Sequence, residues 1–404
     1  MNKQNKLIQP IIRNRPFQRY ILLVLVSTVF FVLFLTSALV NIPDHDPDTA
    51  IAAPAPESPD PGVITQPEPT PGNDPAPSFE QPPEVLPTPE PVKDSICPLT
   101  GVPMEESKTR LRPLAISLSN VPEALPMNGV SQADIIYEVL IESGHTRLLG
   151  IFQDFTNVSK VGSIRSARHY TAEIAHSYDA IFITAGGSPL GYAEIREQGI
   201  THMDEVGGSR REIFFRDRLR VPGMRFESLH SVVITNDRVM RWFPEYDFPL
   251  IHDESFDQGL FFVEDGTPVN GERAEEIAVK FSSHRTTGFI YDPAEKVYHM
   301  RHFNRDFIDA NNDEKPAFTN VLVIKTSIRG LPGDSDGRRD VTTIGAGEGY
   351  FINGGRYIEI NWSRADKDAP YVYTNKDGSL LELGRGKSYI CIISTSTDMS
   401  VTFN

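Results

Sequence analysis

The chain has 404 residues, of which 39% are hydrophobic and 23% are charged, and its formal net charge is −15. This composition excludes a wholly disordered protein and a membrane protein with many spans. The acidic charge also argues against nucleic acid as a partner, because binding to a phosphate backbone requires a basic surface.

The first 40 residues predict a membrane anchor. Residues 1–19 carry five Lys and Arg residues and no acidic residue, and the 21 residues 20–40 contain no charge. A helix of about 20 apolar residues spans the hydrocarbon core of a bilayer. Because the positive charges precede the apolar segment, we expect a cytoplasmic tail over 1–19, a single span of the cytoplasmic membrane over 20–40, and an extracytoplasmic remainder. The length of the segment favours a retained anchor over the alternative, a cleaved signal peptide.

A spacer follows the anchor. Residues 41–92 hold 16 of the 32 prolines and ten carboxylates, with no Lys or Arg. Such a segment cannot bury enough apolar surface to offset the loss of chain entropy. We therefore expect a disordered, Pro-rich acidic linker over 41–93.

The folded part begins near Cys97 and is long enough for two modest cores. The expected fold class is α+β, with a mixed α/β part over 97–250 packed against a β-rich part over 280–404. The chain has two cysteines, Cys97 and Cys391. They offer a disulfide in an oxidising compartment, and the alternative is two unpaired thiols with Cys391 in the core.

The first part alternates strands and helices. Segments rich in Ile, Leu, Val and Phe predict strands over 113–118, 135–141, 148–155 and 180–184. A helix is expected over 166–178, because Tyr170, Ile174 and Tyr178 fall on one face, and Ser166 is available as its N-cap. A second helix is expected from Pro189 to about 198, with Ser188 as its N-cap.

From about residue 286 the pattern is β-dominated, with turns at Asp-Pro, Gly-Gly and Asp-Gly pairs. Lys376-Asp377-Gly378 predicts a hairpin turn. The expected strands are 288–291, 297–301, 320–325, 349–352, 356–362, 371–374 and 387–394.

Several motifs along 98–400 resemble the YerB-like family of bacterial envelope proteins, domain of unknown function 3048. The motifs are Pro98-Leu99-Thr100-Gly101, Arg112-Pro113-Leu114-Ala115, Ala133-Asp134-Ile135-Ile136-Tyr137-Glu138, Gly162-Ser163-Ile164-Arg165-Ser166-Ala167-Arg168, Ala185-Gly186-Gly187-Ser188-Pro189 and Phe214-Phe215-Arg216-Asp217. The resemblance implies an extracytoplasmic α+β unit with an envelope role linked to peptidoglycan enzymes. Two features depart from the family pattern: a membrane-spanning stretch replaces lipidation, and His230-Ser231-Val232-Val233-Ile234 stands where His-Asn-Leu-Tyr-Thr is expected.

The strongest candidate site is an anion site at the start of the first helix. Arg165 and Arg168 lie three residues apart there, and a helix N-terminus offers free N–H groups and a partial positive charge. Arg147 is a third candidate member. In the alternative, these arginines form structural pairs with Glu138, Glu142 or Asp154.

Further candidate site residues are weaker. Gly186, Gly187 and Ser188 form a second anion candidate at a helix N-terminus, although Ser188 suits a cap better than a nucleophile. If the protein is an enzyme, Glu138 and Asp217 are the candidate acids, and Arg216 joins Arg165 and Arg168 in holding an anionic group.

No cofactor or metal ion is expected. Asp309, Asn311 and Asp313 imitate the first ligands of a calcium loop, but Lys315 and Asn320 replace residues that such a loop requires. His299 and His302 are expected on the surface of a hairpin. The function favoured by the sequence is a membrane-anchored extracytoplasmic binding module for a cell-wall component or a wall-synthesis enzyme. The alternative is a hydrolase or lyase acting on an anionic cell-wall polymer.

Overall fold

The computed structural model describes residues 94–404, apart from 208–209, 222, 224–228 and 397–400. The tail, the apolar segment 20–40 and the linker expected over 1–93 lie outside the described residues. Within the described ranges, no helix is long and apolar enough to cross a membrane.

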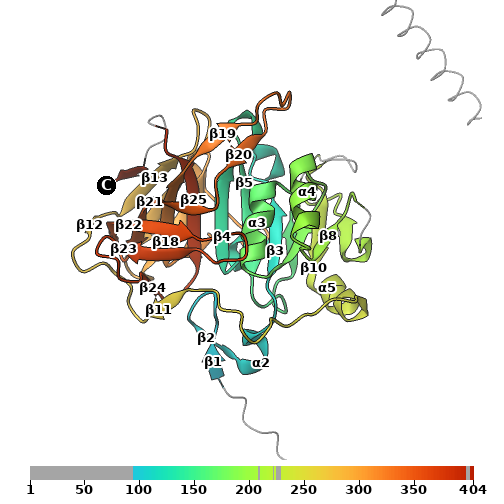
Figure 1. Cartoon of the computed structure of the whole chain (residues 1–404), viewed down its shortest axis with the longest axis horizontal. Helices are drawn as coiled ribbons and strands as arrows, with labels where there is room; N and C mark the ends of the chain where they lie inside the picture. The colour runs from blue at the N-terminus through green and yellow to red at the C-terminus, as the bar shows by residue number, and fades with distance from the viewer. Residues whose placement is uncertain (1–93, 208–209, 222, 224–228, 397–400) are drawn as a thin grey trace, which may run out of the picture. The chain divides into compact units, whose positions relative to one another are not determined.

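A mixed sheet of eleven strands runs through the folded unit (Figure 1). Its order is β12-β22-β21-β18-β25-β4-β5-β3-β7-β8, with β23 paired to β22. The strands are β3 (Leu114–Leu118), β4 (Ile135–Leu140), β5 (Thr146–Phe152), β7 (Ile181–Thr184), β8 (His202–Asp204), β12 (Glu272–Arg273), β18 (Asn320–Thr326), β21 (Gly345–Asn353), β22 (Arg356–Arg364), β23 (Val372–Asn375) and β25 (Ser388–Ser394).

Strand β25 joins the two expected parts of the fold. It comes from the C-terminal part, yet it pairs in parallel with β4 of the N-terminal part and with β18. The described residues from Asp94 onward accordingly belong to one compact unit. The division between 97–250 and 280–404 therefore separates segments of sequence that share one sheet.

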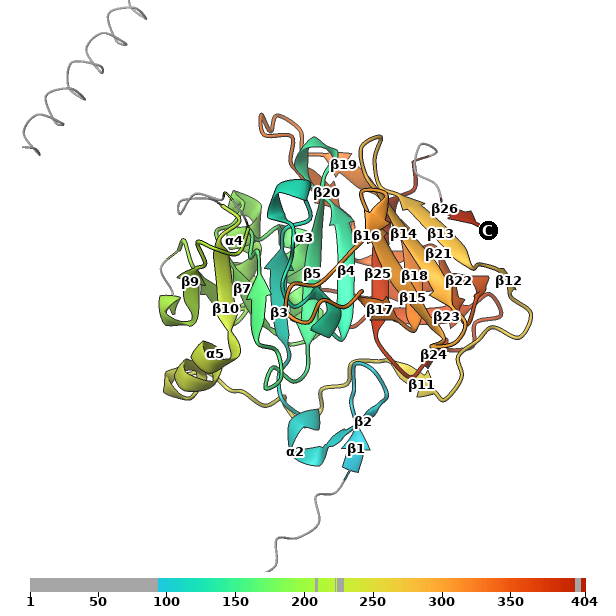
Figure 2. The same cartoon turned by 180° about the vertical axis from the view of Figure 1, so that it is seen from behind.

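A second sheet of six strands covers one face of the large sheet near its centre (Figure 2). Its order is β16-β15-β14-β13-β26, with β17 paired to β15. The strands are β13 (Glu276–Lys280), β14 (Thr286–Asp292), β15 (Val297–His302), β16 (Arg305–Asp306), β17 (Ala317–Phe318) and β26 (Val401–Phe403).

One sheet of three strands and three sheets of two strands complete the β structure of the described residues. They are β6-β10-β9, β1-β2, β11-β24 and β19-β20. Their strands are β1 (Asp94–Ile96), β2 (Pro103–Glu105), β6 (Lys160–Gly162), β9 (Phe214–Arg216), β10 (Val232–Thr235), β11 (Phe261–Val263), β19 (Ile328–Gly330), β20 (Arg339–Val341) and β24 (Glu382–Gly384).

Helices α3 (His169–Ser177) and α4 (Pro189–Glu197) lie side by side on the other face of the large sheet (Figure 1). The predicted apolar face of the first helix is confirmed, because Tyr170, Ile174 and Tyr178 are all buried. Two further short helices are α2 (Glu106–Thr109), which lies beside β1 and β2, and α5 (Asn236–Trp242), which lies beside β10.

The N-cap was predicted correctly for α4 but not for α3. Ser188 caps α4 as expected, because its hydroxyl accepts a hydrogen bond of 3.0 Å from the Gly191 amide. For α3 the prediction was wrong. The N-cap is Arg168, whose amide donates to the Thr171 hydroxyl at 2.9 Å, and Ser166 lies before the helix.

The two cysteines are free and buried, so the disulfide alternative was wrong. Cys97 is 1% exposed and Cys391 is 0% exposed. Burial raises the pKa of both thiols, which makes them unreactive core residues.

Candidate functional site

The candidate site lies at the carboxyl edge of the parallel strands. Strands β18, β25, β4, β3, β7 and β8 run in one direction, and β5 is antiparallel between β4 and β3. Ligands of open α/β sheets bind outside the carboxyl ends of such strands. Glu142 follows β4 at this edge, Arg147 lies near the start of β5, and Arg165 and Arg168 lead into α3.

Arg168 forms a bidentate ion pair with Glu142. Its Nε and Nη2 donate to the two carboxylate oxygens at 2.7 and 2.9 Å, and both side chains are largely buried. Burial alone would raise the pKa of Glu142, but the hydrogen bonds and charge of Arg168 outweigh it and lower that pKa. For Arg168, the structural-pair alternative is therefore confirmed.

Arg147 is the most buried arginine at this edge, with 3% of its surface exposed. Its Nη1 donates to the Ser166 carbonyl at 3.1 Å, whereas its Nε is buried without a hydrogen-bond partner. Burial, with the nearby charges of Arg168 and Arg165, lowers the pKa of Arg147 to about 9. A buried guanidinium without a carboxylate partner destabilises the folded state, because buried charges are normally paired with an opposite charge.

Arg165 adds a third positive charge. Its Nη1 lies 3.4 Å from the Leu229 carbonyl, and burial followed by the charge of Arg168 lowers its pKa. Among the described residues, no carboxylate lies within ion-pair distance of Arg165 or Arg147. We call Arg147, Arg165, Arg168 and Glu142 the arginine cluster. It holds three guanidinium groups and one carboxylate.

The glycine turn before α4 is already filled by a carboxylate of the protein. Asp204 accepts hydrogen bonds from the amides of Gly186, Val206 and Gly207 and from the Tyr192 hydroxyl, at 2.6 to 3.0 Å. Asp204 thus occupies the Gly186 amide, and the Ser188 amide donates to the Ala167 carbonyl at 3.0 Å, so neither is free for an external anion. The prediction of a second anion site at Gly186, Gly187 and Ser188 was wrong for this reason.

Arg216 and Asp217 are each paired within the fold. Arg216 binds Glu205 through Nε and Nη2 at 3.2 and 3.0 Å. Lys160 donates to Asp217 at 2.8 Å. Burial alone would raise the pKa of Asp217, but the Lys160 hydrogen bond and the Leu219 amide outweigh it and lower the pKa. A carboxylate that is ionised so readily is a poor general acid.

Glu138 does not face a cleft. It is 0% exposed and points between the two large sheets, where the Arg285 guanidinium donates to Oε1 at 3.0 Å. Four neutral donors complete its shell. These are Asn120 and Thr146 on Oε1, and Thr287 and Tyr389 on Oε2, all at 2.6 to 2.9 Å. Its placement makes Glu138 a structural residue and overturns its assignment as a candidate catalytic acid.

Sequence reasoning missed the partners in this buried network. His302 was expected on the surface, yet it is 1% exposed and lies 2.9 Å from Arg285 Nη2. Asp309, the first residue of the calcium-like motif, is also buried and accepts hydrogen bonds from the amides of Gly129 and Ser131. The sequence indicates the burial of His302 in one way. Side chains alternate between the two faces of strand β15, which places His302 on the same face as Tyr298 and Met300.

The buried histidines predict that stability falls in mild acid. Burial lowers the pKa of His202 and of His230 to about 4 and that of His302 further. The unfolded chain therefore binds three protons below pH 6.5 that the folded chain does not bind. Asp134 acts in the opposite direction, because burial raises its pKa to about 6. At pH 5 the folded chain therefore holds a proton on Asp134 that the unfolded chain does not hold. We expect a net loss of about 4 kcal/mol between pH 7 and pH 5. Urea unfolding at the two pH values checks this, and equal stability would contradict it.

Two family models match the chain. The model described as "Protein of unknown function (DUF3048) N-terminal domain" matches residues 99–237, and the model of its C-terminal domain matches residues 277–390. The chain belongs to the DUF3048 family. The N-terminal match contains the whole arginine cluster, and the C-terminal match contains Arg285 and His302.

Relatives of this family agree with the assignment. A protein of Bacillus subtilis named "Putative lipoprotein YerB" is 28% identical over 310 residues, which cover 76% of this chain and 88% of that protein. The crystal structure of YerB from Bacillus subtilis superposes with a TM-score of 0.64 at 27% identity, covering 76% of this chain and 99% of that one. The described fold is therefore the fold of this family.

Proposed function

We propose that the protein is a membrane-anchored, extracytoplasmic envelope protein whose folded unit binds an anionic cell-wall component at the arginine cluster. The observation that carries the proposal is the surplus of positive charge. Arg147 and Arg165 have no carboxylate partner among the described residues. The one carboxylate of the cluster, Glu142, is already paired with Arg168. A phosphate or carboxylate group beside Arg165 would neutralise this charge and accept charge-assisted hydrogen bonds.

The N-terminus of α3 supports the same ligand class. The helix has nine residues and begins directly after Arg168, so its partial positive charge adds to that of the guanidinium groups. A binding role is favoured over a hydrolase, since Glu138 is inaccessible and Asp217 is held ionised by Lys160.

Calorimetric titration with glycerol 3-phosphate tests the anion site, with glycerol as the uncharged probe. We expect the full-length protein to bind the phosphate ester but not glycerol. Arg165→Ala should weaken binding about tenfold or more, because a charge-assisted hydrogen bond contributes about 1.5–3 kcal/mol. The matched control is Arg273→Ala, which removes an equal charge from a side chain that is 72% exposed. Equal affinity of wild type and Arg165→Ala would contradict the proposal.

Anchoring through residues 20–40 is proposed from the sequence of this chain. The B. subtilis relative carries the word lipoprotein in its name, but no cysteine precedes Cys97 here, and Cys97 is buried in the folded unit. An apolar, uncharged segment of 21 residues provides an anchor without a lipid.

Protease added to intact cells tests this topology. We expect cleavage within 41–92 and release of a folded fragment of about 300 residues, because this segment is polar and proline-rich and lies outside the membrane. A protein that is cut only after the cells are broken open would contradict the extracytoplasmic placement.

A further inference from the structure

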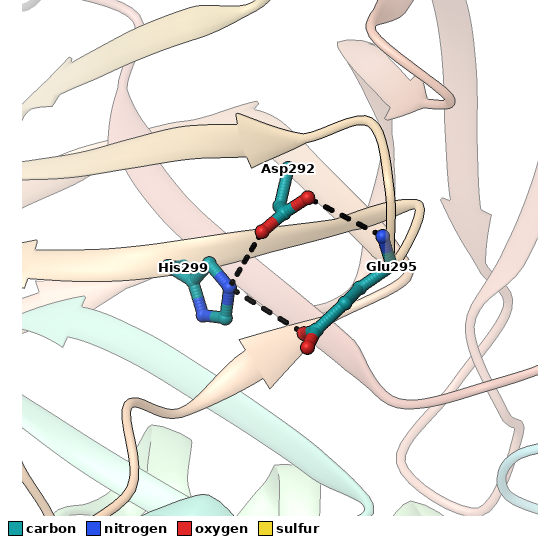
Figure 3. Close-up of side chains that lie close together, drawn as sticks. All are labelled: Asp292, Glu295 and His299. Atoms are coloured by element: carbon teal, nitrogen blue, oxygen red, sulfur yellow. Dashed lines mark hydrogen bonds and ion pairs between the residues drawn. The ribbon is translucent and has the colours of Figure 1, made fainter.

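The turn between β14 and β15 brings together two carboxylates and an imidazole (Figure 3). Asp292 ends β14, Glu295 lies in the turn, and His299 lies on β15. The candidate ligand atoms of the three side chains all lie within 4.8 Å of one another. Figure 3 shows the two carboxylates on either side of the His299 Nε2 atom.

The separations are too long for hydrogen bonds. His299 Nε2 lies 3.8 Å from Asp292 Oδ2 and 3.7 Å from Glu295 Oε2, beyond the usual limit for such bonds. Ligands of a tetrahedral ion, each about 2.0–2.2 Å from the metal, lie about 3.4 Å from one another. The Nε2 atom is thus spaced from each carboxylate nearly as one ligand of a metal ion is from another, and all three ligand atoms lie within 4.8 Å of one another.

The His299 ring itself lacks hydrogen bonds. Its Nδ1 is buried without a partner, and its Nε2 faces the two carboxylates without a hydrogen bond to any described residue. The Nε2 atom is on the open side of the ring, since the His299 side chain is 22% exposed, so an ion can reach it beside the two carboxylates.

The neighbouring Lys296 does not pair with Asp292 or Glu295, so both carboxylates are available to bind an ion. Lys296, which lies in the same turn, points to Asp265 with its Nζ 3.5 Å from the carboxylate. The other Asp292 oxygen accepts hydrogen bonds from the amides of Ala294 and Glu295, which fixes the turn and the direction of the carboxylate.

We propose that Asp292, Glu295 and His299 bind a divalent transition-metal ion, with Zn²⁺ as the ion that fits best. The imidazole ligand selects against Ca²⁺ and Mg²⁺, which prefer oxygen ligands alone. Three protein ligands leave a fourth position open to water or to another ligand. None of the three residues belongs to the arginine cluster, so this site is independent of the anion site.

Zinc titration of the metal-stripped, full-length protein tests the site, with a chromophoric chelator as competitor. We expect Glu295→Gln and His299→Gln each to weaken Zn²⁺ binding at least tenfold. The matched control, His284→Gln, removes an exposed histidine of the same region and should bind Zn²⁺ like the wild type. Zn²⁺ should also raise the unfolding midpoint of the wild type but not of the two variants, whereas Ca²⁺ and Mg²⁺ should not.

Glu295 is 66% exposed, so Glu295→Gln should fold even if His299→Gln does not. Its unfolding midpoint in the presence of EDTA should equal that of the wild type. Zn²⁺ affinity of Glu295→Gln within twofold of the wild-type value would overturn the proposal. Binding of Ca²⁺ as tight as that of Zn²⁺ would overturn it as well.

Discussion

Replacement of Arg285 by methionine should lower the free energy of unfolding by about 3–5 kcal/mol. The variant leaves Glu138 with neutral donors alone, at a position that is 0% exposed. An unpaired charge in such a place is strongly destabilising, even though the intact pair contributes little compared with apolar residues. Urea unfolding followed by circular dichroism measures the change.

Two further variants separate the charge from the packing. Arg305→Met removes an exposed arginine from the same sheet and should change stability by less than about 0.5 kcal/mol. The double variant Glu138→Gln with Arg285→Met leaves no unpaired charge, so it should recover part of the loss. An Arg285→Met protein as stable as Arg305→Met would show that Glu138 is not held by this ion pair.

The second large effect is expected at Arg168, with little effect at Arg165. Arg168→Ala strands the Glu142 carboxylate in a largely buried position, and we expect a loss of about 3 kcal/mol. Arg165→Ala removes a charge that has no carboxylate partner among the described residues, so stability should change by less than about 1 kcal/mol. Thermal unfolding of the two variants without added ligand compares them.

Lysine variants provide the control for charge. Arg168→Lys keeps the charge but loses the planar fork that binds both Glu142 oxygens, so it should recover only part of the stability. If Arg165→Ala were as destabilising as Arg168→Ala, Arg165 would have a structural role, and the anion site would lose its basis.

The local pattern of the chain predicts its elements well. All four strands expected before residue 190 are present as β3, β4, β5 and β7, because apolar runs bounded by turn residues determine such strands locally. The same holds for the buried face of α3 and for the Ser188 cap, which depend on residues three or four positions apart.

The pairing of charged side chains was not predictable in the same way. Arg165 and Arg168 look equivalent in the sequence, and they differ because Glu142, 26 residues away, reaches only Arg168. Arg285 is 147 residues from Glu138 and meets it because the six-stranded sheet packs against the face of the large sheet that carries Glu138. Asp204 likewise fills the glycine turn only once β8 is placed beside β7.

Selenate soaked into crystals of the protein shows whether the arginine cluster binds an oxyanion, because the anomalous signal of selenium locates the anion without prior assumption. We expect an anomalous peak within hydrogen-bond distance of the Arg165 guanidinium, beside Arg147 and Arg168, and its loss in Arg165→Ala crystals. Selenate bound elsewhere on the surface, with no peak beside these three arginines, would contradict the proposal.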